Sequence, residues 1–404
     1  MTINHRIDDE QIVALIGPNF SGRTQCLRAA LVAEQSSVYI GPEISNHFTG
    51  LALTINEELT WGRRPSDLDI RLIEKLRLAP LLEMNPFSIS GGEQALLAIA
   101  AGCASNPDVL AIDCVFEQLS MDNRLLAINL LSQSPRRPQK IRFVDNRLGE
   151  YISSLQSVKQ YIMPTAVFEH AAETPHIDAT LDSTPKPQSC SITIDGVDFS
   201  YKKGKRVLNG VTFEFKPGPV YILRGDNGAG KTTLAKVLAG LLRPSCGSIR
   251  VDGRRVDLWR EPGSVVSYHF QNPDLQLLST SVIDELRLGG RAFRPRSKAV
   301  PETAALLQLF GLGSVAAEHP LDLPFVLRKR VAIAAAFATA RPWVILDEPT
   351  LGQDAANCDA MAAFFRRTAA SGQGLIIITH SDEFACKMLG HTVIMEDGLL
   401  RTIG

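Results

Sequence analysis

Short apolar runs that lead directly into polar residues recur along the second half of the chain. Three of them are VYIL at Val220, WVIL at Trp343 and LIII at Leu375. Uninterrupted apolar runs of this length are typical of strands buried in a parallel sheet. Ligands of such sheets bind at the carboxyl ends of the strands. The pattern therefore predicts an α/β fold with its chemistry along one edge of the sheet.

The run at Val220 leads into a glycine-rich loop and then into a helix pattern. Residues 225–232 read GDNGAGKT, which satisfies GxxxxGK[ST] between a strand and a helix. Glycines let backbone N–H groups face phosphate oxygens, and a helix N-terminus favours an anion. Lys231 is expected to reach the outer phosphates of a nucleotide, and the Thr232 hydroxyl to ligate Mg²⁺. The predicted nucleotide-binding residues are Gly225, Asp226, Asn227, Gly228, Ala229, Gly230, Lys231, Thr232 and Thr233.

The other two runs end in groups suited to phosphoryl transfer. Asp347 is expected to hold Mg²⁺ through water, and Glu348 to orient the attacking water as general base. His380 is a candidate sensor of the γ-phosphate. Together with the loop, these residues predict a nucleotide-hydrolysing site in the second half.

The first half repeats this arrangement with altered polar residues. IVALI at Ile12 precedes GPNFSGRT at 17–24, and VLAID and IRFVDN follow further on. Asp113 lies 234 positions before Asp347, whereas the two loops are 208 positions apart. The difference is expected to be a β-rich insertion in the second copy, so the first copy is predicted to be trimmed. Its candidate nucleotide-binding residues are Gly17, Gly22, Arg23 and Thr24.

Length and composition limit the possible classes. A chain of 404 residues is too long for one ordinary core, so two domains are expected, at 1–163 and 191–404, with a linker at 164–190. The net charge of -1 lacks the basic excess of a nucleic-acid-binding protein. The seven scattered cysteines indicate no disulfide framework and no zinc site. The polar start and short apolar stretches predict a cytoplasmic protein without a membrane anchor.

A further motif precedes the aspartate of the first copy. Ser90-Gly91-Gly92-Glu93, beginning 23 residues before Asp113, resembles the signature motif of ABC-type ATPases. With the second-half motifs, the resemblance covers nearly the whole chain outside the linker. It implies two nucleotide-binding domains stacked head to tail as a pseudo-dimer, with ATP held between the loop of one and the signature helix of the other. Ser90 would then contact the γ-phosphate, and Ser90 with Glu93 also fits a capping box.

The 234-residue offset indicates which parts each copy has lost. The signature of the second copy reads LPFVL, so Pro324 takes the place of Ser90. In the first copy, Cys114 aligns with Glu348, Asn146 aligns with His380, and Arg23 corresponds to Lys231. Head-to-tail stacking would gather the intact parts in one composite site and the altered parts in the other. One hydrolytic and one degenerate site are therefore predicted.

The properties of the degenerate site stay partly open. Arg23, Thr24 and Asp113 keep positive charge and metal ligands, but a planar guanidinium differs from an ammonium in shape, so the site could hold Mg-nucleotide or fail to. For Cys114 the alternatives are a redox group and a small apolar filler, and the filler is favoured.

The resemblance implies three supporting residues. Tyr201 matches the aromatic residue that stacks on adenine, with a strand-core tyrosine as the alternative. Gln271 matches the glutamine that contacts Mg²⁺ and the attacking water. The segment 352–354 corresponds to a loop that crosses to the opposite site.

The segment FQNPDLQLLSTSVIDEL at Phe270 resembles the ATPases of energy-coupling factor (ECF) transporters. This implies import of a vitamin or metal ion, with an integral membrane scaffold (T-type) subunit and a substrate-binding membrane subunit as partners. Leu275, Leu277 and Leu278 would line the docking groove or pack locally. One alternative, a soluble tandem ABC ATPase acting on ribosomes or DNA, is disfavoured by the short, non-basic linker. Another, a non-hydrolysing nucleotide-binding regulator, is disfavoured by Glu348.

Overall fold

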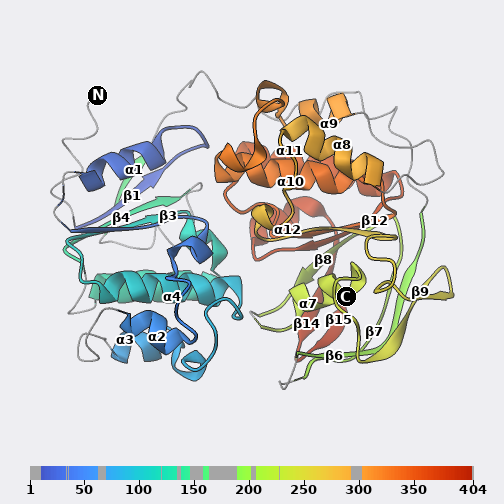
Figure 1. Cartoon of the computed structure of the whole chain (residues 1–404), viewed down its shortest axis with the longest axis horizontal. Helices are drawn as coiled ribbons and strands as arrows, with labels where there is room; N and C mark the ends of the chain where they lie inside the picture. The colour runs from blue at the N-terminus through green and yellow to red at the C-terminus, as the bar shows by residue number, and fades with distance from the viewer. Residues whose placement is uncertain are drawn as a thin grey trace. The chain divides into compact units, whose positions relative to one another are not determined.

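The computed structural model describes residues 11–32, 34, 36–61, 70–119, 121–133, 138–145, 158–162, 189–201, 206–226, 228–292 and 303–402. The chain divides into two compact units, drawn in Figure 1. The first unit is Met1–Ala171 with Leu351–Ala355, and the second is Ala172–Thr350 with Ala356–Gly404. The predicted linker lies almost entirely outside the described residues, so the boundaries at 163 and 191 stay predictions.

The first unit is built on a five-stranded parallel sheet in the order β2-β3-β4-β1-β5. Its strands are β1 (Ile12–Ile16), β2 (Ser37–Ile40), β3 (Val109–Asp113), β4 (Lys140–Asp145) and β5 (Lys159–Ile162). Every residue of β1 and β3 is buried, which explains why both sequences are apolar apart from Asp113 at the end of β3. In Figure 1, α1 (Arg23–Val32) covers one face of this sheet and α4 (Gly91–Ala104) covers the other.

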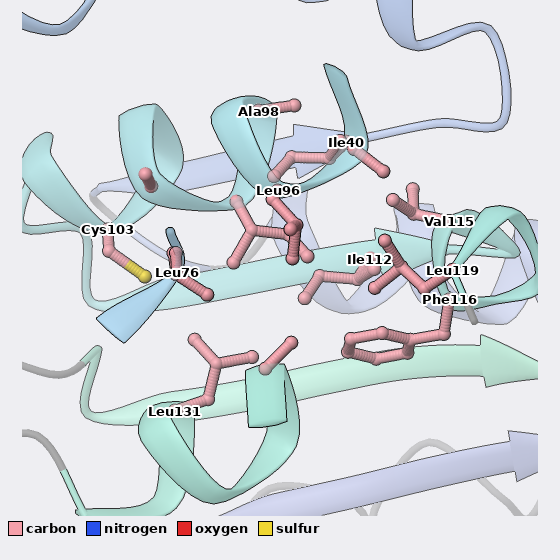
Figure 2. Close-up of a cluster of buried hydrophobic side chains, with 14 of the residues drawn as sticks. Ile40, Leu76, Leu96, Ala98, Cys103, Ile112, Val115, Phe116, Leu119 and Leu131 are labelled. Carbon is pink, nitrogen blue, oxygen red and sulfur yellow. The ribbon is translucent and has the colours of Figure 1, made fainter. Parts of the chain in front are cut away.

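The larger core of the first unit lies between α4 and the sheet. Figure 2 shows Leu96 of α4 beside Ile40 and Ile112 of the sheet, and Ala98 of the same helix belongs to the same core. The same core extends to side chains from the remaining helices of the unit, such as Leu131. Those helices are η1 (Ile44–His47), α2 (Ile55–Thr60), α3 (Ile70–Lys75), η3 (Ala79–Leu81), η4 (Val115–Gln118) and α5 (Met121–Gln133).

The second unit contains a six-stranded sheet in the order β11-β12-β13-β8-β14-β15, in which only β15 runs antiparallel to its neighbour. Its strands are β8 (Val220–Arg224), β11 (Val266–His269), β12 (Trp343–Asp347), β13 (Gly374–Ile378), β14 (His391–Glu396) and β15 (Leu399–Thr402). Its helices are α7 (Lys231–Leu238), η6 (Pro273–Leu275), α8 (Val282–Ala292), α9 (Thr303–Leu309), η7 (Gly313–Val315), η8 (Pro320–Asp322), α10 (Phe325–Ala338), α11 (Ala355–Ala370) and α12 (Asp382–Met388).

A four-stranded antiparallel sheet adds a second layer to this unit, in the order β10-β9-β6-β7. Its strands are β6 (Ile192–Ser200), β7 (Arg206–Phe215), β9 (Cys246–Val251) and β10 (Arg254–Val256). Phe215 of β7 and Leu234 of α7 share one core with Trp343 of the parallel sheet. The predicted β-rich insertion is therefore confirmed, and among the described residues this antiparallel sheet occurs in the second unit alone.

The internal repeat is visible in the backbone itself. The helices α4 and α10 begin 234 positions apart and also end 234 positions apart, as do the strands β3 and β12. Non-glycine residues with left-handed backbones recur at the same offset, with φ of 57° at Cys114 and 49° at Glu348. The five parallel strands follow the same spatial order in both units. No helix in the described part of the chain is both long enough and apolar enough to span a bilayer.

Candidate functional site

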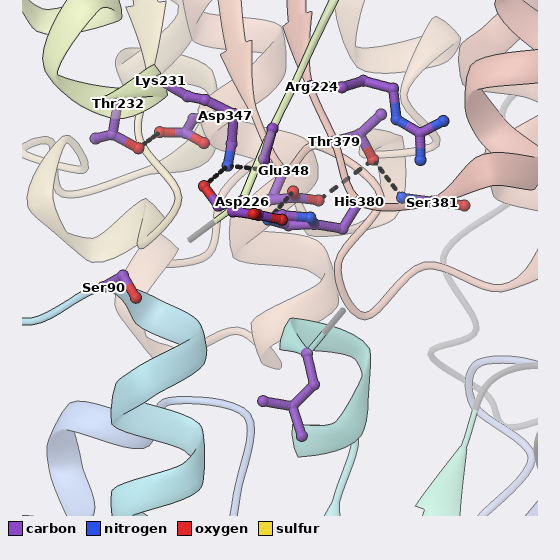
Figure 3. A network of polar contacts seen from close by, with 12 residues as sticks. Ser90, Arg224, Asp226, Lys231, Thr232, Asp347, Glu348, Thr379, His380 and Ser381 are labelled. Atoms are coloured by element: carbon purple, nitrogen blue, oxygen red, sulfur yellow. Dashed lines mark hydrogen bonds and ion pairs between the residues drawn. The ribbon is translucent and has the colours of Figure 1, made fainter. Parts of the chain in front are cut away.

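The phosphate loop of the second unit connects β8 to α7, as its sequence predicts. Gly225 has φ of 141°, and a Cβ atom there would lie 2.2 Å from the carbonyl oxygen of Met395, so only glycine fits. The Lys231 Nζ donates to the carbonyl oxygens of Gly225 at 2.7 Å and Asp226 at 2.9 Å (Figure 3). Burial lowers the pKa of Lys231, while nearby carboxylates raise it. The ammonium is thus positioned inside the loop where phosphate oxygens would lie.

Asp347 ends β12 beside the first turn of α7. Its Oδ2 accepts from the Thr232 hydroxyl at 2.9 Å and from the Tyr268 hydroxyl at 2.8 Å. Burial raises the pKa of Asp347, and these two hydrogen bonds oppose that effect. A hydroxyl and a carboxylate held together at the amino end of a helix are the oxygen ligands that Mg²⁺ uses in nucleotide sites, so the residues fit a Mg-nucleotide.

Glu348 follows Asp347 in a left-handed backbone conformation, with φ of 49°. Its N–H donates to the Ile378 carbonyl at 2.9 Å, and its Oε2 accepts from the Thr379 hydroxyl at 3.3 Å (Figure 3). Within the described residues, Oε1 has no hydrogen-bond partner, and it lies 4.0 Å from the His380 Nε2. Burial, followed by the charge of Asp347, raises the pKa of Glu348 to about 7. A carboxyl group whose pKa lies near neutral pH, and whose second oxygen accepts no hydrogen bond from the described residues, is suited to general-base chemistry.

The other predicted residues of the second unit surround this centre. The Tyr201 ring is 48% exposed, packs edge-on against Phe199 at 4.9 Å between centroids, and has its hydroxyl 3.2 Å from the Thr233 Oγ1. Gln271 follows β11, and its carbonyl oxygen accepts from the Lys329 Nζ at 2.6 Å. Adenine stacking on Tyr201 and metal contact by Gln271 stay predictions. Asn227 lies outside the described residues.

The docking prediction for three leucines is divided by the structure. Leu275 and Leu278 are 67% and 78% exposed, whereas Leu277 is buried. Leu277 therefore packs locally and is not available to a partner. The other two remain candidates for docking.

The signature residues of the first unit begin α4. Ser90 is the N-cap, with the Glu93 N–H donating to its Oγ at 3.4 Å and its own N–H donating to the Glu93 Oε2 at 2.8 Å. This confirms the capping box, and Gly91 and Gly92 form the first turn. In the second unit the N-cap of α10 is Pro324, which has no side-chain capping bond. The contact between Ser90 and a γ-phosphate stays a prediction.

The phosphate loop of the first unit, residues 17–24, is held by its own arginine. The Arg23 side chain is buried, and it donates to the carbonyl of Asp145 at 2.5 Å and to the Asn19 Oδ1 at 3.3 Å. The Asn19 N–H donates to the Asp354 Oδ2 at 2.9 Å, within the same unit. Gly22 keeps a left-handed backbone, and Thr24 is the second residue of α1. The guanidinium thus bonds to protein oxygens, as Lys231 does in the second unit.

The strand ends of the first unit keep part of the second unit's arrangement. The Tyr39 hydroxyl donates to the Asp113 Oδ2 at 2.8 Å, just as Tyr268 does to Asp347. Cys114 is buried in an apolar cluster, and burial raises the pKa of its thiol well above the ordinary value. A neutral thiol supports the apolar-filler interpretation. Asn146 lies outside the described residues.

Two contributors escaped the sequence analysis. Tyr268 holds Asp347, and its signal was a polar aromatic residue directly before the predicted Gln271 segment. Lys329 lies inside α10. The feature of the sequence that could have indicated its burial is the offset of 234 positions, which aligns Lys329 with the buried Ala95. A basic triplet in a helix resembles a solvated face, so neither the pattern nor the charge distinguished it.

Comparisons with known proteins agree with this geometry. A family model described as ABC transporter matches residues 208–351. A "Putative ABC transporter ATP-binding protein" from Pyrococcus abyssi is 32% identical over 216 residues, covering 53% of this chain and 83% of that protein. The "Putative HMP/thiamine import ATP-binding protein YkoD" from Bacillus subtilis is 24% identical over 397 residues, covering 85% of this chain and 72% of that one.

One solved structure is described as CbiO1 from Clostridium perfringens, part of the ABC transporter complex CbiONQ. It is 27% identical, covers 53% of this chain and 88% of that chain, and has a TM-score of 0.44. The identity and coverage shared with the Pyrococcus relative, together with the family match, decide the assignment. The chain belongs to the family of ABC transporter ATP-binding proteins, and it is an ATPase that uses ATP with Mg²⁺.

Proposed function

We propose that the chain is the ATP-hydrolysing energy subunit of an ECF-type importer, with one hydrolytic and one degenerate composite site. The observation that carries this proposal is the unequal distribution of functional groups. In the second unit Thr232 bonds to Asp347 and Thr379 bonds to Glu348, whereas the serine-capped signature helix occurs in the first unit. If the units stack head to tail, Ser90 completes the site of Lys231, and Pro324 would face Arg23.

In this proposal the residues divide the work of hydrolysis. Lys231 and the loop N–H groups bind the outer phosphates, while Thr232, Asp347 and Gln271 hold Mg²⁺, which neutralises charge on those phosphates. Glu348 accepts a proton from water through Oε1, which has no hydrogen-bond partner among the residues that the structure describes. His380 contacts the γ-phosphate, and Tyr201 stacks on the adenine. Cys114 offers no carboxylate base, so the other site turns over slowly or not at all.

The inferred partners are an integral membrane scaffold (T-type) subunit and a substrate-binding membrane subunit. Two features support them: the exposed Leu275 and Leu278 in the segment after Gln271, and the sequence resemblance of that segment to ECF ATPases. The Bacillus relative is described as a putative HMP/thiamine import ATP-binding protein, which supports import of a vitamin or a metal ion. The chain would then lie at the cytoplasmic face of the membrane.

The composite site is tested by Ser90→Arg in the full chain. A bulky cation at the signature turn is expected to lower the ATPase rate about 100-fold, although Ser90 lies far from Lys231 in sequence. The matched control is Pro324→Arg, at the equivalent helix start, which is expected to change the rate less than about threefold. Thermal unfolding of each variant checks that the substituted unit is folded, the first unit for Ser90→Arg and the second for Pro324→Arg. An unchanged rate in a folded Ser90→Arg protein would refute head-to-tail pairing.

The transport role is tested by co-purification from membranes. Hydrophobic membrane subunits are expected to remain with the tagged chain in mild detergent, and Leu275→Asp with Leu278→Asp is expected to release them. Hydrolysis stimulated by ribosomes, with no membrane subunit retained, would favour the soluble tandem ATPase instead.

A further inference from the structure

A lysine lies inside the second unit, on α10. Lys329 is 0% exposed, and its Nζ donates to the carbonyl oxygen of Gln271 at 2.6 Å. The ammonium also lies 5.9 Å from the centroid of the Phe325 ring. Burial lowers the pKa of Lys329 to about 8, while the carboxylates of Glu348 and Asp347 act in the opposite direction. A fully buried ammonium is costly, so its presence requires an explanation.

Holding the carbonyl of Gln271 does not by itself require a charge. The matching strands β2 and β11 pair in the same register, Ile40 with Ile112 and His269 with Leu346. Two residues after each strand, Pro42 therefore corresponds to Gln271. In the first unit the Pro42 carbonyl accepts from the Gln118 Nε2 at 2.7 Å. A neutral amide thus makes the equivalent bond in the unit that lacks the general base.

The charged groups of the two units differ as a matched set. In the second unit, the ammonium groups of Lys231 and Lys329 act on two neighbouring carboxyl groups. Their charges lower the pKa of Asp347 and of Glu348 and so oppose the effect of burial. At the equivalent positions, the first unit has Asp113 and Arg23, with Cys114 and Ala95 in place of the second pair. Glu348 and Lys329 are therefore present together in one unit and absent together from the other.

We propose that Lys329 is a positioning residue for ATP hydrolysis, which acts as the buried counter-charge of Glu348 and fixes the main chain of Gln271 against α10. This inference rests on the general-base role proposed for Glu348. Lys231 belongs to the phosphate loop and is expected to neutralise phosphates once nucleotide binds. Lys329 lies on α10, outside the phosphate loop, so its charge is not taken up by phosphates. It therefore continues to compensate the charge of Glu348 and keeps that carboxylate oriented toward water.

The test is Lys329→Gln in the full chain, because glutamine keeps an N–H donor for Gln271 and removes the charge. We expect kcat to fall about tenfold while KM for ATP changes less than about twofold, since the phosphate loop is untouched. The matched control is Arg328→Gln, which alters the neighbouring cation. The Arg328 Nε lies 3.4 Å from the Asp274 Oδ1. Removal of this guanidinium is expected to leave kcat within about twofold of the wild-type value. Unchanged kcat in Lys329→Gln would overturn the proposal.

A second measurement keeps the proposal testable if Lys329→Gln folds poorly. Denaturant midpoints are compared for Lys329→Gln, Glu348→Gln and the double variant. If Lys329 is the counter-charge of Glu348, Glu348→Gln raises the midpoint more in the Lys329→Gln chain than in the wild-type chain, because only the former leaves the carboxylate uncompensated. Additive losses would overturn the pairing. Failure of the proposed function is distinguishable, since Glu348→Gln would then keep wild-type turnover.

Discussion

The two units of this chain share the arrangement of five parallel strands and differ in polar chemistry. Both place five parallel strands in the same order, and both turn sharply after the aspartate strand through a left-handed residue, Cys114 or Glu348. Both also hold the aspartate by a tyrosine hydroxyl, with the same 2.8 Å distance. The tyrosine–aspartate bond is therefore a feature of the repeated fold and not a mark of hydrolysis. What separates the units is Glu348, with Thr379 and His380 around it, and the buried Lys329.

This comparison explains how the first unit tolerates its losses. The repeated strands and α4 are held by burial of apolar side chains, such as Leu96 and Ile112, which do not depend on the catalytic groups. The buried Arg23 side chain is held by the hydrogen bond that it donates to the Asp145 carbonyl, so it is part of the folded structure of the unit. If Glu348 and Lys329 are the base and counter-charge proposed above, the first unit lacks both members of a costly buried pair while it keeps its apolar core.

The largest expected effect comes from removing the base. Glu348→Gln should lower kcat by about 10²- to 10⁴-fold, because an amide cannot accept the proton from water. Binding of ATP should persist, since Lys231 and Thr232 remain. The rate is measured by phosphate release and the binding by titration with a fluorescent ATP analogue.

The matched change in the first unit is Cys114→Ala, at the equivalent left-handed position. ATP turnover by the Cys114→Ala protein is expected to stay within about twofold of wild type, since a neutral thiol cannot act as the base. A silent Cys114→Ala protein that still binds ATP would reverse the assignment of the two units.

A smaller effect is expected from inserting a carboxylate into the first unit. Cys114→Glu should lower the free energy of unfolding by about 2–3 kcal/mol more than Cys114→Gln near pH 8. The reason is that the first unit has Ala95 at the position where the second unit has Lys329. The negative charges of Glu117, Asp113 and Asp145 also act on this position and oppose a further carboxylate, while the Arg23 cation partly offsets them. Burial raises the pKa of such a carboxyl, so the gap should shrink as pH falls and the group protonates.

Denaturant unfolding at pH 8 and pH 5.5 measures this gap. Equal stability of Cys114→Glu and Cys114→Gln at both pH values would show that the first unit accommodates a carboxylate without a lysine at the position of Ala95. That result would contradict the pairing of Glu348 with a lysine.

The sequence predicts most of the fold and the principal site residues, and the reasons are physical. Uninterrupted apolar runs mark buried parallel strands such as β3 and β12, and glycines that need left-handed backbones mark the phosphate loop. The offset of 234 positions transfers these assignments to the first half, and the helices α4 and α10 follow it at both ends.

The sequence does not predict tertiary contacts that run against local pattern. Lys329 stands between two arginines and reads as part of a solvated face, yet tertiary packing removes it from water. Leu277 cannot be separated from Leu275 and Leu278 by composition, because the backbone alone decides which side chain turns inward. The pairing of Tyr268 with Asp347 joins residues 79 positions apart, beyond the reach of any periodicity.

The smallest predicted effect concerns the adenine contact, for which the first unit has no counterpart among its described residues. Tyr201→Ala should weaken ATP binding by about fivefold, roughly 1 kcal/mol, the low end of aromatic stacking on a base, since the ring is half exposed and keeps free area for a ligand. Tyr201→Phe retains the ring and removes only the hydroxyl contact to Thr233, so its affinity should stay within about twofold. Titration of ATP against inorganic triphosphate separates the two contributions. Stacking predicts that Tyr201→Ala weakens ATP and leaves triphosphate unchanged, whereas equal weakening of both would mean that Tyr201 acts through Thr233 on the phosphate loop.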